Sequence, residues 1–299
     1  MKISRIHLPL TGGSLAERLL RNRGRLRQAL ATHLAKKTNR ALATFMSGDW
    51  QPVVSQKESA IPISLTSWRP RLPQLPLVLL TLLQQSLRPK EILVWLTKED
   101  VNLLTDETKE RFQTFGVRFE TCDDLKPHKK WLPMIEQGRR DPFVICDDDI
   151  VYPPEWFAAL VAEDRADAYV GIRCHRVAVN ADKTIASYSA WGKMVQAGDQ
   201  PSHAMFVTGG GGAVIHPGRI QKNFLDRNEI MQKCPKADDV WLKAAHLAAG
   251  IPCYKTRYNF PCLEFPGTNE TGLAMTNVDG GGNDEQIRNL EKYFSMISG

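Results

Sequence analysis

The amino-acid sequence predicts an α/β fold with a mostly parallel central sheet flanked by helices. The first observation is that apolar, strand-like runs alternate with helix-like runs between residues 61 and 147, as they do in βαβ units. The second is that polar residues follow directly on two of these runs, at 66–69 and 147–149. Ligands of such sheets bind beyond the carboxyl ends of the strands. The sequence therefore predicts a binding site where these two polar segments meet.

The individual elements can be placed in order along the chain. In the first half, short apolar runs predict strands at 61–66, 91–96, 117–122 and 143–147. Apolar residues at helical spacing between these runs predict helices at 75–86, 105–114 and 130–138. The second half is less regular, and it predicts strands at 169–173 and 251–256 and a helix at 238–249. The polar, glycine-rich stretch 265–285 predicts a mobile loop.

The N-terminal region differs from the rest of the chain in charge. Residues 1–49 contain ten Lys and Arg against two acidic residues, a net charge of +8. Residues 14–45 are predicted to form a helix, because five leucines fall on one face: Leu15, Leu19, Leu26, Leu30 and Leu34. Two interpretations stay open, a helix docked on the main domain or a basic amphipathic helix on an anionic membrane surface. We divide the chain into a basic helical arm at 1–50 and a main domain at 60–299.

Composition disfavours several classes of protein. The 250 residues after the arm hold 29 basic and 31 acidic residues, a net charge of −2, whereas a nucleic-acid-binding domain carries its basic stripe on the folded domain. The six cysteines form no CxxC pair and no zinc-ligand spacing, so we expect free thiols in a reducing cytoplasm. The N-terminus lacks the apolar core of a secretory signal. The most apolar stretch, 75–83, is far shorter than the ~18 residues of a membrane span.

Three consecutive aspartates, Asp147, Asp148 and Asp149, come directly after the apolar run 143–146. In an extended chain successive side chains alternate between faces, so we expect Asp147 and Asp149 to point one way and Asp148 the other. Such a D-x-D pair suits Mg²⁺ or Mn²⁺, which proteins commonly hold with one or two carboxylates plus substrate phosphates. The alternative is a solvated acidic turn ahead of Pro153 and Pro154, with a helix beginning at the prolines.

Four blocks of sequence resemble, in order, those of bacterial family-2-like glycosyltransferases of surface polysaccharide synthesis. They are 64-SLTSWRPR-71 with 89-PKEILVWL-96, 123-DDLKPHKKWLPMI-135, 144-VICDDDIVYPPEWFAAL-160 and 235-PKADDVWLKAAHLAAGIP-252. The set spans residues 61–256. The chain is more loosely similar to the catalytic domain of exostosins, which also pair a DDD strand with a later acidic pair. The resemblance implies a GT-A fold with a nucleotide-sugar-binding half at 60–150 and an acceptor half at 151–299.

The resemblance also implies a role for individual residues. The donor, a UDP-sugar, would be contacted by Thr66, Ser67, Arg71, Lys129, Lys130, Asp147 and Asp148. The ion, Mn²⁺ or Mg²⁺, would be held by Asp149 together with Asp147. The acceptor would be a glycan or lipid-linked glycan, and the enzyme would be cytoplasmic, at the inner face of the membrane. The chain departs from the family at Trp68 and Arg69, where Tyr and Pro are frequent, and at His216, where Tyr is common.

Sugar transfer with inversion needs a base that takes the proton of the acceptor hydroxyl. Asp238 and Asp239 are the candidates, since they begin the helix predicted at 238–249. A helix N-terminus can use one of them as an N-cap. The resemblance points to Asp239 as the base, which leaves Asp238 as the expected cap, and it favours inversion over retention.

Other features leave alternatives open. The run 209-GGGG-212 lacks the Gly-Lys-Ser/Thr ending of a phosphate loop, so it forms either a floor under a bound sugar or a packed turn. Trp191 and Trp241 could stack on sugar rings, but burial in the core is expected of both. Two other functions compete with glycosyl transfer: a metal-dependent phosphoryl or nucleotidyl transferase, and a non-catalytic glycan-binding protein.

Overall fold

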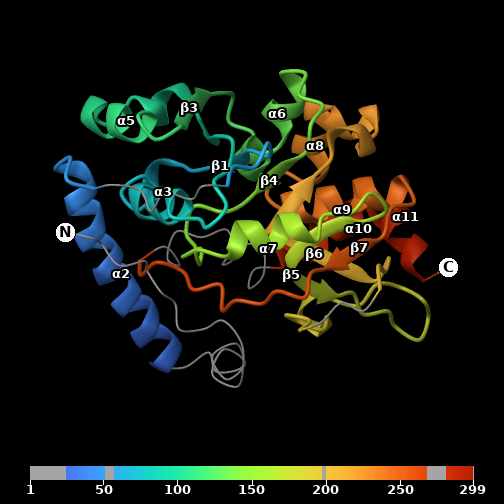
Figure 1. Cartoon of the computed structure of the whole chain (residues 1–299). Coiled ribbons are helices and arrows are strands. Elements are labelled where there is room, and N and C mark those ends of the chain that lie inside the picture. Colours follow the sequence, from blue (N-terminus) through green and yellow to red (C-terminus); the bar gives the residue numbers. More distant parts are fainter. Residues whose placement is uncertain (1–24, 51–56, 197–199, 268–280, 299) are drawn as a thin grey trace.

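The computed structural model describes residues 25–50, 57–196, 200–267 and 281–298. Seven strands form one sheet in the order β3-β2-β1-β4-β6-β5-β7 (Figure 1). Their bounds are β1 Ile63–Thr66, β2 Ile92–Leu96, β3 Val117–Thr121, β4 Phe143–Ile145, β5 Tyr169–Arg176, β6 Met205–Ile215 and β7 Cys253–Lys255. Only β6 runs against its neighbours β4 and β5, while the other pairs are parallel. The predicted α/β fold with a mostly parallel sheet is confirmed.

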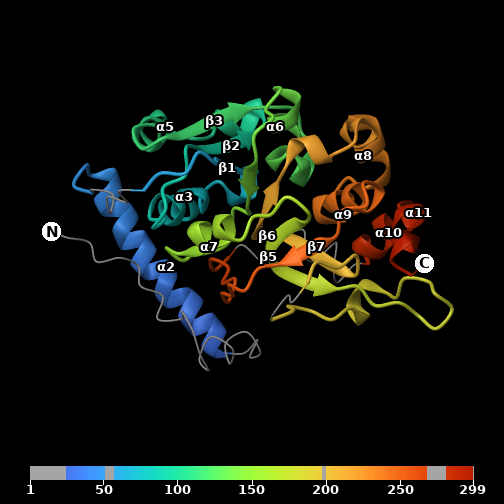
Figure 2. The same ribbon diagram turned by 45° about the vertical axis from the view of Figure 1, so that its right-hand side comes forward.

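Helices cover both faces of the sheet, as Figure 2 shows. They are α2 Arg25–Met46, α3 Leu75–Leu83, α4 Lys98–Val101, α5 Asp106–Gln113, α6 Leu132–Glu136, α7 Trp156–Ala162, α8 Arg227–Lys233, α9 Asp238–Ala248, α10 Gly282–Asn289 and α11 Glu291–Phe294. Side chains alternate along each strand, so β2 sends Val94 into a core shared with α2, α3 and α7. Its neighbour Trp95 enters a second core shared with α6, α8 and α9. The sheet is therefore buried on both faces.

Two parts of the second half differ from the sequence-based expectation. The glycine run 209–212 lies inside strand β6 and is no turn, because four residues without side chains fit between crowded neighbours there. The stretch 265–285 was expected to be a loop, but α10 begins at Gly282 within it. Residues 268–280 of that stretch lie outside the described residues. Helices α10 and α11 pack Ile287, Leu290 and Phe294 into the second core. The sequence analysis did not predict these two helices.

The arm helix α2 docks on the main domain. Its described part buries Ala31, Leu34, Ala41 and Phe45, and the ring of Phe45 packs 4.6 Å from that of Phe112. Of the predicted leucine stripe, Leu34 is buried and Leu30 packs against the core, whereas Leu26 is 53% exposed. Leu15 and Leu19 lie outside the described residues. None of the helices in the described ranges is both long and apolar enough to cross a membrane.

Candidate active site

All ten residues that the sequence predicts for the site line one cavity. It has a volume of about 580 Å³ and lies where β1, β2 and β4 end. The predicted residues in its wall are Thr66, Ser67, Arg71, Lys129, Lys130, Asp147, Asp148, Asp149, Asp238 and Asp239. The chain brings them together because the carboxyl ends of its parallel strands meet at one edge of the sheet.

The aspartate triplet does not alternate as an extended strand would. Strand β4 ends at Ile145, and the chain bends at Asp148 and Asp149. One nitrogen of Arg71, Nη1, lies 2.7 Å from Oδ1 of Asp148 and 2.9 Å from Oδ2 of Asp149. Asp147 instead contacts Lys130. The expectation that Asp147 and Asp149 share one direction and Asp148 the other is therefore wrong, because the strand ends before the triplet.

Asp148 is the most tightly held of the three carboxylates. It is 5% exposed, and the hydroxyl of Ser67 donates a 2.5 Å hydrogen bond to its Oδ2. Ser67 is thereby occupied within the protein. The hydroxyl of Thr66 is likewise donated to the carbonyl of Trp95 at 2.7 Å. These two residues of the β1 loop shape the cavity wall, and their hydroxyl protons are already used.

Asp149 carries a carboxylate that the protein compensates incompletely. Burial raises its pKa to about 7, and the nearby charges of Asp147, Asp148 and Glu264 add to that rise, while Arg71 opposes it. A carboxylate in this state gains from an additional cation. The position of Asp149 therefore suits the predicted metal ligand.

Lys130 lies at the centre of the charge cluster. It is 3% exposed, and its Nζ lies 2.6 Å from Oδ1 of Asp147 and 2.9 Å from Oδ2 of Asp238. Burial alone would lower the pKa of the ammonium, but the surrounding carboxylates raise it well above the usual value. Its neighbour Lys129 donates a 3.1 Å hydrogen bond to the carbonyl of Ser67. Lys130 thus links the triplet to the acidic pair, and Lys129 fixes the β1 loop.

The acidic pair at the start of α9 does not cap the helix as expected. The N-cap residue is Ala237, which offers no side-chain hydrogen bond, and Asp238 and Asp239 occupy the first helical turn. Asp238 turns to Lys130 instead. Asp239 accepts a 2.8 Å hydrogen bond from the backbone N–H of Gly209 at its Oδ1, and burial raises its pKa. The prediction that Asp238 is an N-cap is wrong, because a buried ammonium takes its carboxylate.

The glycine run forms the floor of the charge cluster. A Cβ added at Gly210 would lie 2.5 Å from Oδ2 of Asp147, and one at Gly209 would lie 3.0 Å from Nζ of Lys130. Gly212 has a φ of +97° and packs against Trp156, where a Cβ would lie 2.6 Å from the ring. A larger residue is most strongly disfavoured at Gly212, where the positive φ and the rigid ring of Trp156 act together. The packed turn is wrong, because the run lies in strand β6, whereas a floor under a bound sugar stays a prediction.

Several residues of the cavity escaped the sequence analysis. Arg173, at the end of the predicted strand 169–173, lines the cavity, and its Nε donates a 2.6 Å hydrogen bond to the hydroxyl of Thr208. Glu264 also lines it, from the segment after β7. Strand β5 continues past the predicted end to Arg176, so Arg173 lies inside the strand, and no local pattern in the sequence marks either Arg173 or Glu264 as a cavity residue. Trp191 and Trp241 are buried, as expected.

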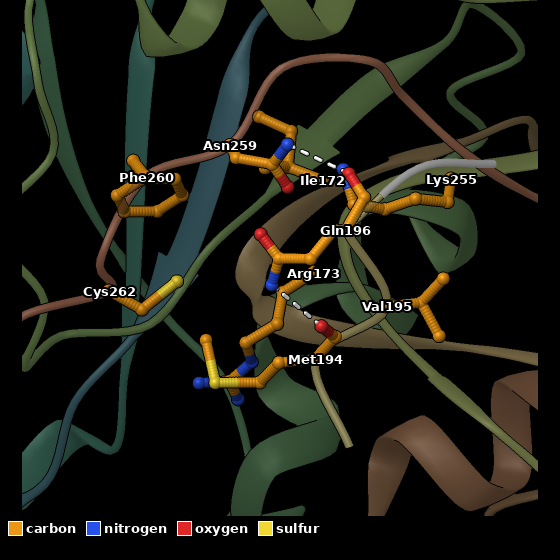
Figure 3. A pocket seen from close by; sticks show the side chains of 9 residues that line it. All are labelled: Ile172, Arg173, Met194, Val195, Gln196, Lys255, Asn259, Phe260 and Cys262. Atoms are coloured by element: carbon orange, nitrogen blue, oxygen red, sulfur yellow. Dashed lines mark hydrogen bonds between the residues drawn. The ribbon is translucent and has the colours of Figure 1, made fainter. Parts of the chain in front are cut away.

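A second void adjoins the site behind Arg173. Figure 3 shows Arg173 between Met194 and Gln196 on one side and Phe260 and Cys262 on the other. The void measures about 10 Å³, roughly the space of a single water molecule. It is therefore no substrate site, and its walls serve to pack Arg173.

The side chains of the cavity determine which kind of divalent-ion site the protein can form. Within the part of the chain that the structure describes, no group of three or more His, Cys, Asp or Glu side chains is arranged to hold a metal. An all-protein cage is thereby absent from these residues. Mn²⁺ and Mg²⁺, however, are often held by one or two carboxylates together with substrate phosphates. Asp149 and Asp147 line the same cavity, so their residue types suit this second kind of site, while a shared ion between them stays a prediction.

The chain is only weakly similar to proteins of known sequence and structure. No family model matches the chain, and no curated protein matches its sequence. Among solved structures, the inositol-1-phosphate CTP transferase from T. maritima is 10% identical, with 66% of this chain and 86% of that chain covered and a TM-score of 0.39. CMP:2-keto-3-deoxy-manno-octonic acid synthetase with CTP is 14% identical, with 75% and 99% covered and a TM-score of 0.41.

A glycosyl-transferring enzyme is also among the similar structures. Glucosyl-3-phosphoglycerate synthase from Mycobacterium tuberculosis, in complex with Mn²⁺, UDP and phosphoglyceric acid, is 10% identical. The match covers 76% of this chain and 78% of that chain, with a TM-score of 0.37. Function does not follow from fold at such identities.

Proposed function

We propose that the protein is a metal-assisted glycosyltransferase that moves a sugar from a UDP-sugar to a glycan acceptor in bacterial capsule or lipopolysaccharide synthesis. One observation carries this proposal. A single cavity of about 580 Å³ unites the aspartate triplet, the acidic pair and buried cations at the strand ends. That volume lies within the roughly 300–1,000 Å³ of small-molecule sites. The bacterial setting and the UDP moiety rest on the resemblance of the four sequence blocks.

The charges of the cavity suit a diphosphate and an ion together. Asp149 and Asp147 would hold Mn²⁺ or Mg²⁺, which supplies Lewis-acid stabilisation of the leaving diphosphate. Arg71, Lys130 and Arg173 line the same volume and add positive charge beside it. Arg71 already bridges Asp148 and Asp149, so it would orient Asp149, one of the two proposed ion ligands.

Asp238 and Asp239 would have different roles. Asp238 is held by Lys130 and 6% exposed, so its carboxylate serves to keep the ammonium in place. Asp239 accepts the N–H of Gly209 at Oδ1, and its raised pKa suits a group that accepts a proton. We assign Asp239 as the base for the acceptor hydroxyl, which implies inversion at the anomeric carbon.

A panel of nucleoside diphosphates tests the donor class. Ligands that bind only the folded state raise the melting temperature by mass action. We expect UDP with Mn²⁺ to raise it more than the other nucleotides do. Donor turnover separates glycosyl transfer from nucleotidyl transfer, because the first releases nucleoside diphosphate and the second pyrophosphate. Release of pyrophosphate, or no turnover of any donor, would favour the two rival functions.

The metal gives a specific prediction. We expect Asp149→Asn to abolish transfer and to weaken UDP binding in Mn²⁺, because the amide removes the charge that attracts the ion. Addition of EDTA to the wild-type protein should lower its UDP affinity in the same way, as measured by calorimetry. Asp106→Asn, on the surface helix α5, is the matched control and should bind UDP normally. UDP affinity that is unchanged without metal would refute the ion's role.

The arm gives a second prediction, on the proposed contact with anionic membrane. Truncation near Gln51 would remove the buried Phe45 and Leu34, so charge reversal is the cleaner test. Each Lys or Arg near an anionic surface contributes about 1 kcal/mol of binding. We therefore expect Lys36→Glu/Lys37→Glu to reduce co-sedimentation with anionic liposomes at low salt. The control is Arg288→Glu/Lys292→Glu at the far end of the molecule (Figure 1). Equal loss in both variants would contradict a membrane-facing arm.

A further inference from the structure

The arm helix contacts the segment after β7 through the side chain of Arg27. Arg27 of α2 donates hydrogen bonds from Nη1 to the carbonyl of Pro261 and from Nη2 to the carbonyl of Cys262, both at 2.6 Å. These partners lie 234 and 235 residues further along the chain. A guanidinium offers its N–H groups in a rigid fork, so two consecutive carbonyls are fixed together. The segment after β7 runs toward α2 in Figure 1.

The clamped segment holds an unfavourable backbone conformation. Cys262 has a φ of +44°, in the left-handed region that residues other than glycine rarely adopt. Such conformations persist only where the surroundings impose them. Arg27 supplies that constraint from one side, and Cys262 lines the same small void as Arg173 on the other, where Figure 3 labels both. The shape of this segment therefore depends on the arm.

The same segment pairs with the chain at the aspartate triplet. The N–H of Phe265 donates to the carbonyl of Asp149, and the N–H of Val151 donates to the carbonyl of Leu263, both at 2.8 Å. Ile150 and Glu264 form an antiparallel bridge between these bonds. The pairing sets the backbone of Asp149 and delivers Glu264 to the cavity wall. An unbroken path of hydrogen bonds and backbone thus leads from Arg27 to the candidate metal ligand.

We infer that Arg27 is a positioning residue of the donor site: it fixes residues 261–265, and through them the backbone of Asp149 and the place of Glu264. The arm is then part of the site's support as well as a docked helix. The effect on metal and donor rests on the proposed function. The effect on the backbone pairing does not, so the two can be measured separately.

The first measurement is hydrogen exchange of peptides that contain the Val151 and Phe265 amides, in protein without ligand. We expect faster exchange in Arg27→Ala, because the clamp that holds their partners is gone. Arg40→Ala is the matched control, since it removes an exposed arginine from the same helix and should leave exchange unchanged. Arg27→Lys, which can still donate to a carbonyl, should recover part of the protection. Equal exchange in Arg27→Ala and Arg40→Ala would overturn the inference.

The second measurement is Mn²⁺ affinity in the presence of UDP, at a temperature where circular dichroism shows each variant folded. Loss of a residue that supports a metal ligand typically weakens metal binding by about 10–100-fold, and we expect Arg27→Ala to fall in this range while Arg40→Ala matches the wild type. Wild-type affinity in Arg27→Ala would overturn the positioning role. If the wild-type protein binds neither Mn²⁺ nor UDP, the proposed function is wrong. The hydrogen-exchange result would still show whether Arg27 stabilises the pairing of residues 261–265 with the aspartate triplet.

Discussion

Replacement of Asp239 by Asn should reduce sugar transfer by about 10²–10⁴-fold, the usual contribution of a general base. The amide keeps the size of the side chain and can still accept the N–H of Gly209 through its oxygen, so the floor of the site should hold its shape. It cannot take a proton from the acceptor hydroxyl. We therefore expect near-normal melting and near-normal UDP affinity beside severely reduced turnover. Steady-state kinetics with saturating donor measures the effect.

Asp238→Asn is the matched control for this substitution. Its carboxylate contacts Lys130 at 2.9 Å and is nearly inaccessible, so the variant should lose stability more than it loses turnover. Near-normal transfer by Asp239→Asn would contradict the base assignment. The leaving phosphate of a retaining mechanism would then be the better proton acceptor. The anomeric configuration of the product, read by NMR, would decide between the two mechanisms.

The second large effect is expected from Lys130→Met. Methionine fills a similar volume but leaves the carboxylates of Asp147 and Asp238 without their shared ammonium. Removing one partner of a buried ion pair costs about 3–5 kcal/mol, because the remaining charge stays buried. We expect the free energy of unfolding, measured with urea, to fall by this order. Lys126→Met breaks the exposed pair with Asp124 and should change stability little.

The loss in Lys130→Met should also depend on pH. Without the ammonium, the two carboxyls hold a proton in the folded state at a pH where the unfolded chain has released it. A folded-state pKa above the unfolded value makes stability rise as pH falls. The difference between wild type and variant should therefore be larger at pH 8 than at pH 5. A difference that does not vary with pH would show that the lost stability has another origin.

The sequence predicted where the site lies better than how its residues pair. Apolar runs mark strands, and parallel strands deliver their carboxyl ends to one edge, so Thr66, Arg71, Lys130 and Asp147 could be brought together from local patterns alone. The pairings depend on where each strand ends and how the chain then bends. Strand β4 stops two residues before Asp147, and neither this nor the ion pair of Lys130 with Asp238 can be read from spacing.

Contacts between distant segments account for the rest of what was missed. Glu264 lies at the cavity because it forms an isolated bridge with Ile150. No local sequence pattern predicts a bridge of a single residue pair. The glycine run reads as a turn, since glycine is disfavoured in strands. Its place inside β6 follows from side chains that crowd it from elsewhere, such as Asp147 and Trp156. The strand conformation of the glycine run therefore depends on tertiary packing, which cannot be inferred from sequence periodicity.

The glycine floor has a consequence for motion during turnover. Strand β6 pairs with β5 at residues 205–208 and with both β4 and β5 at 213–214, so the glycine floor between them is anchored at both ends and we expect it to move little. Rearrangement on substrate entry is then confined to the rim, where Trp68 is 44% exposed. We therefore expect the proposed catalytic groups above the floor to keep fixed relative positions during turnover.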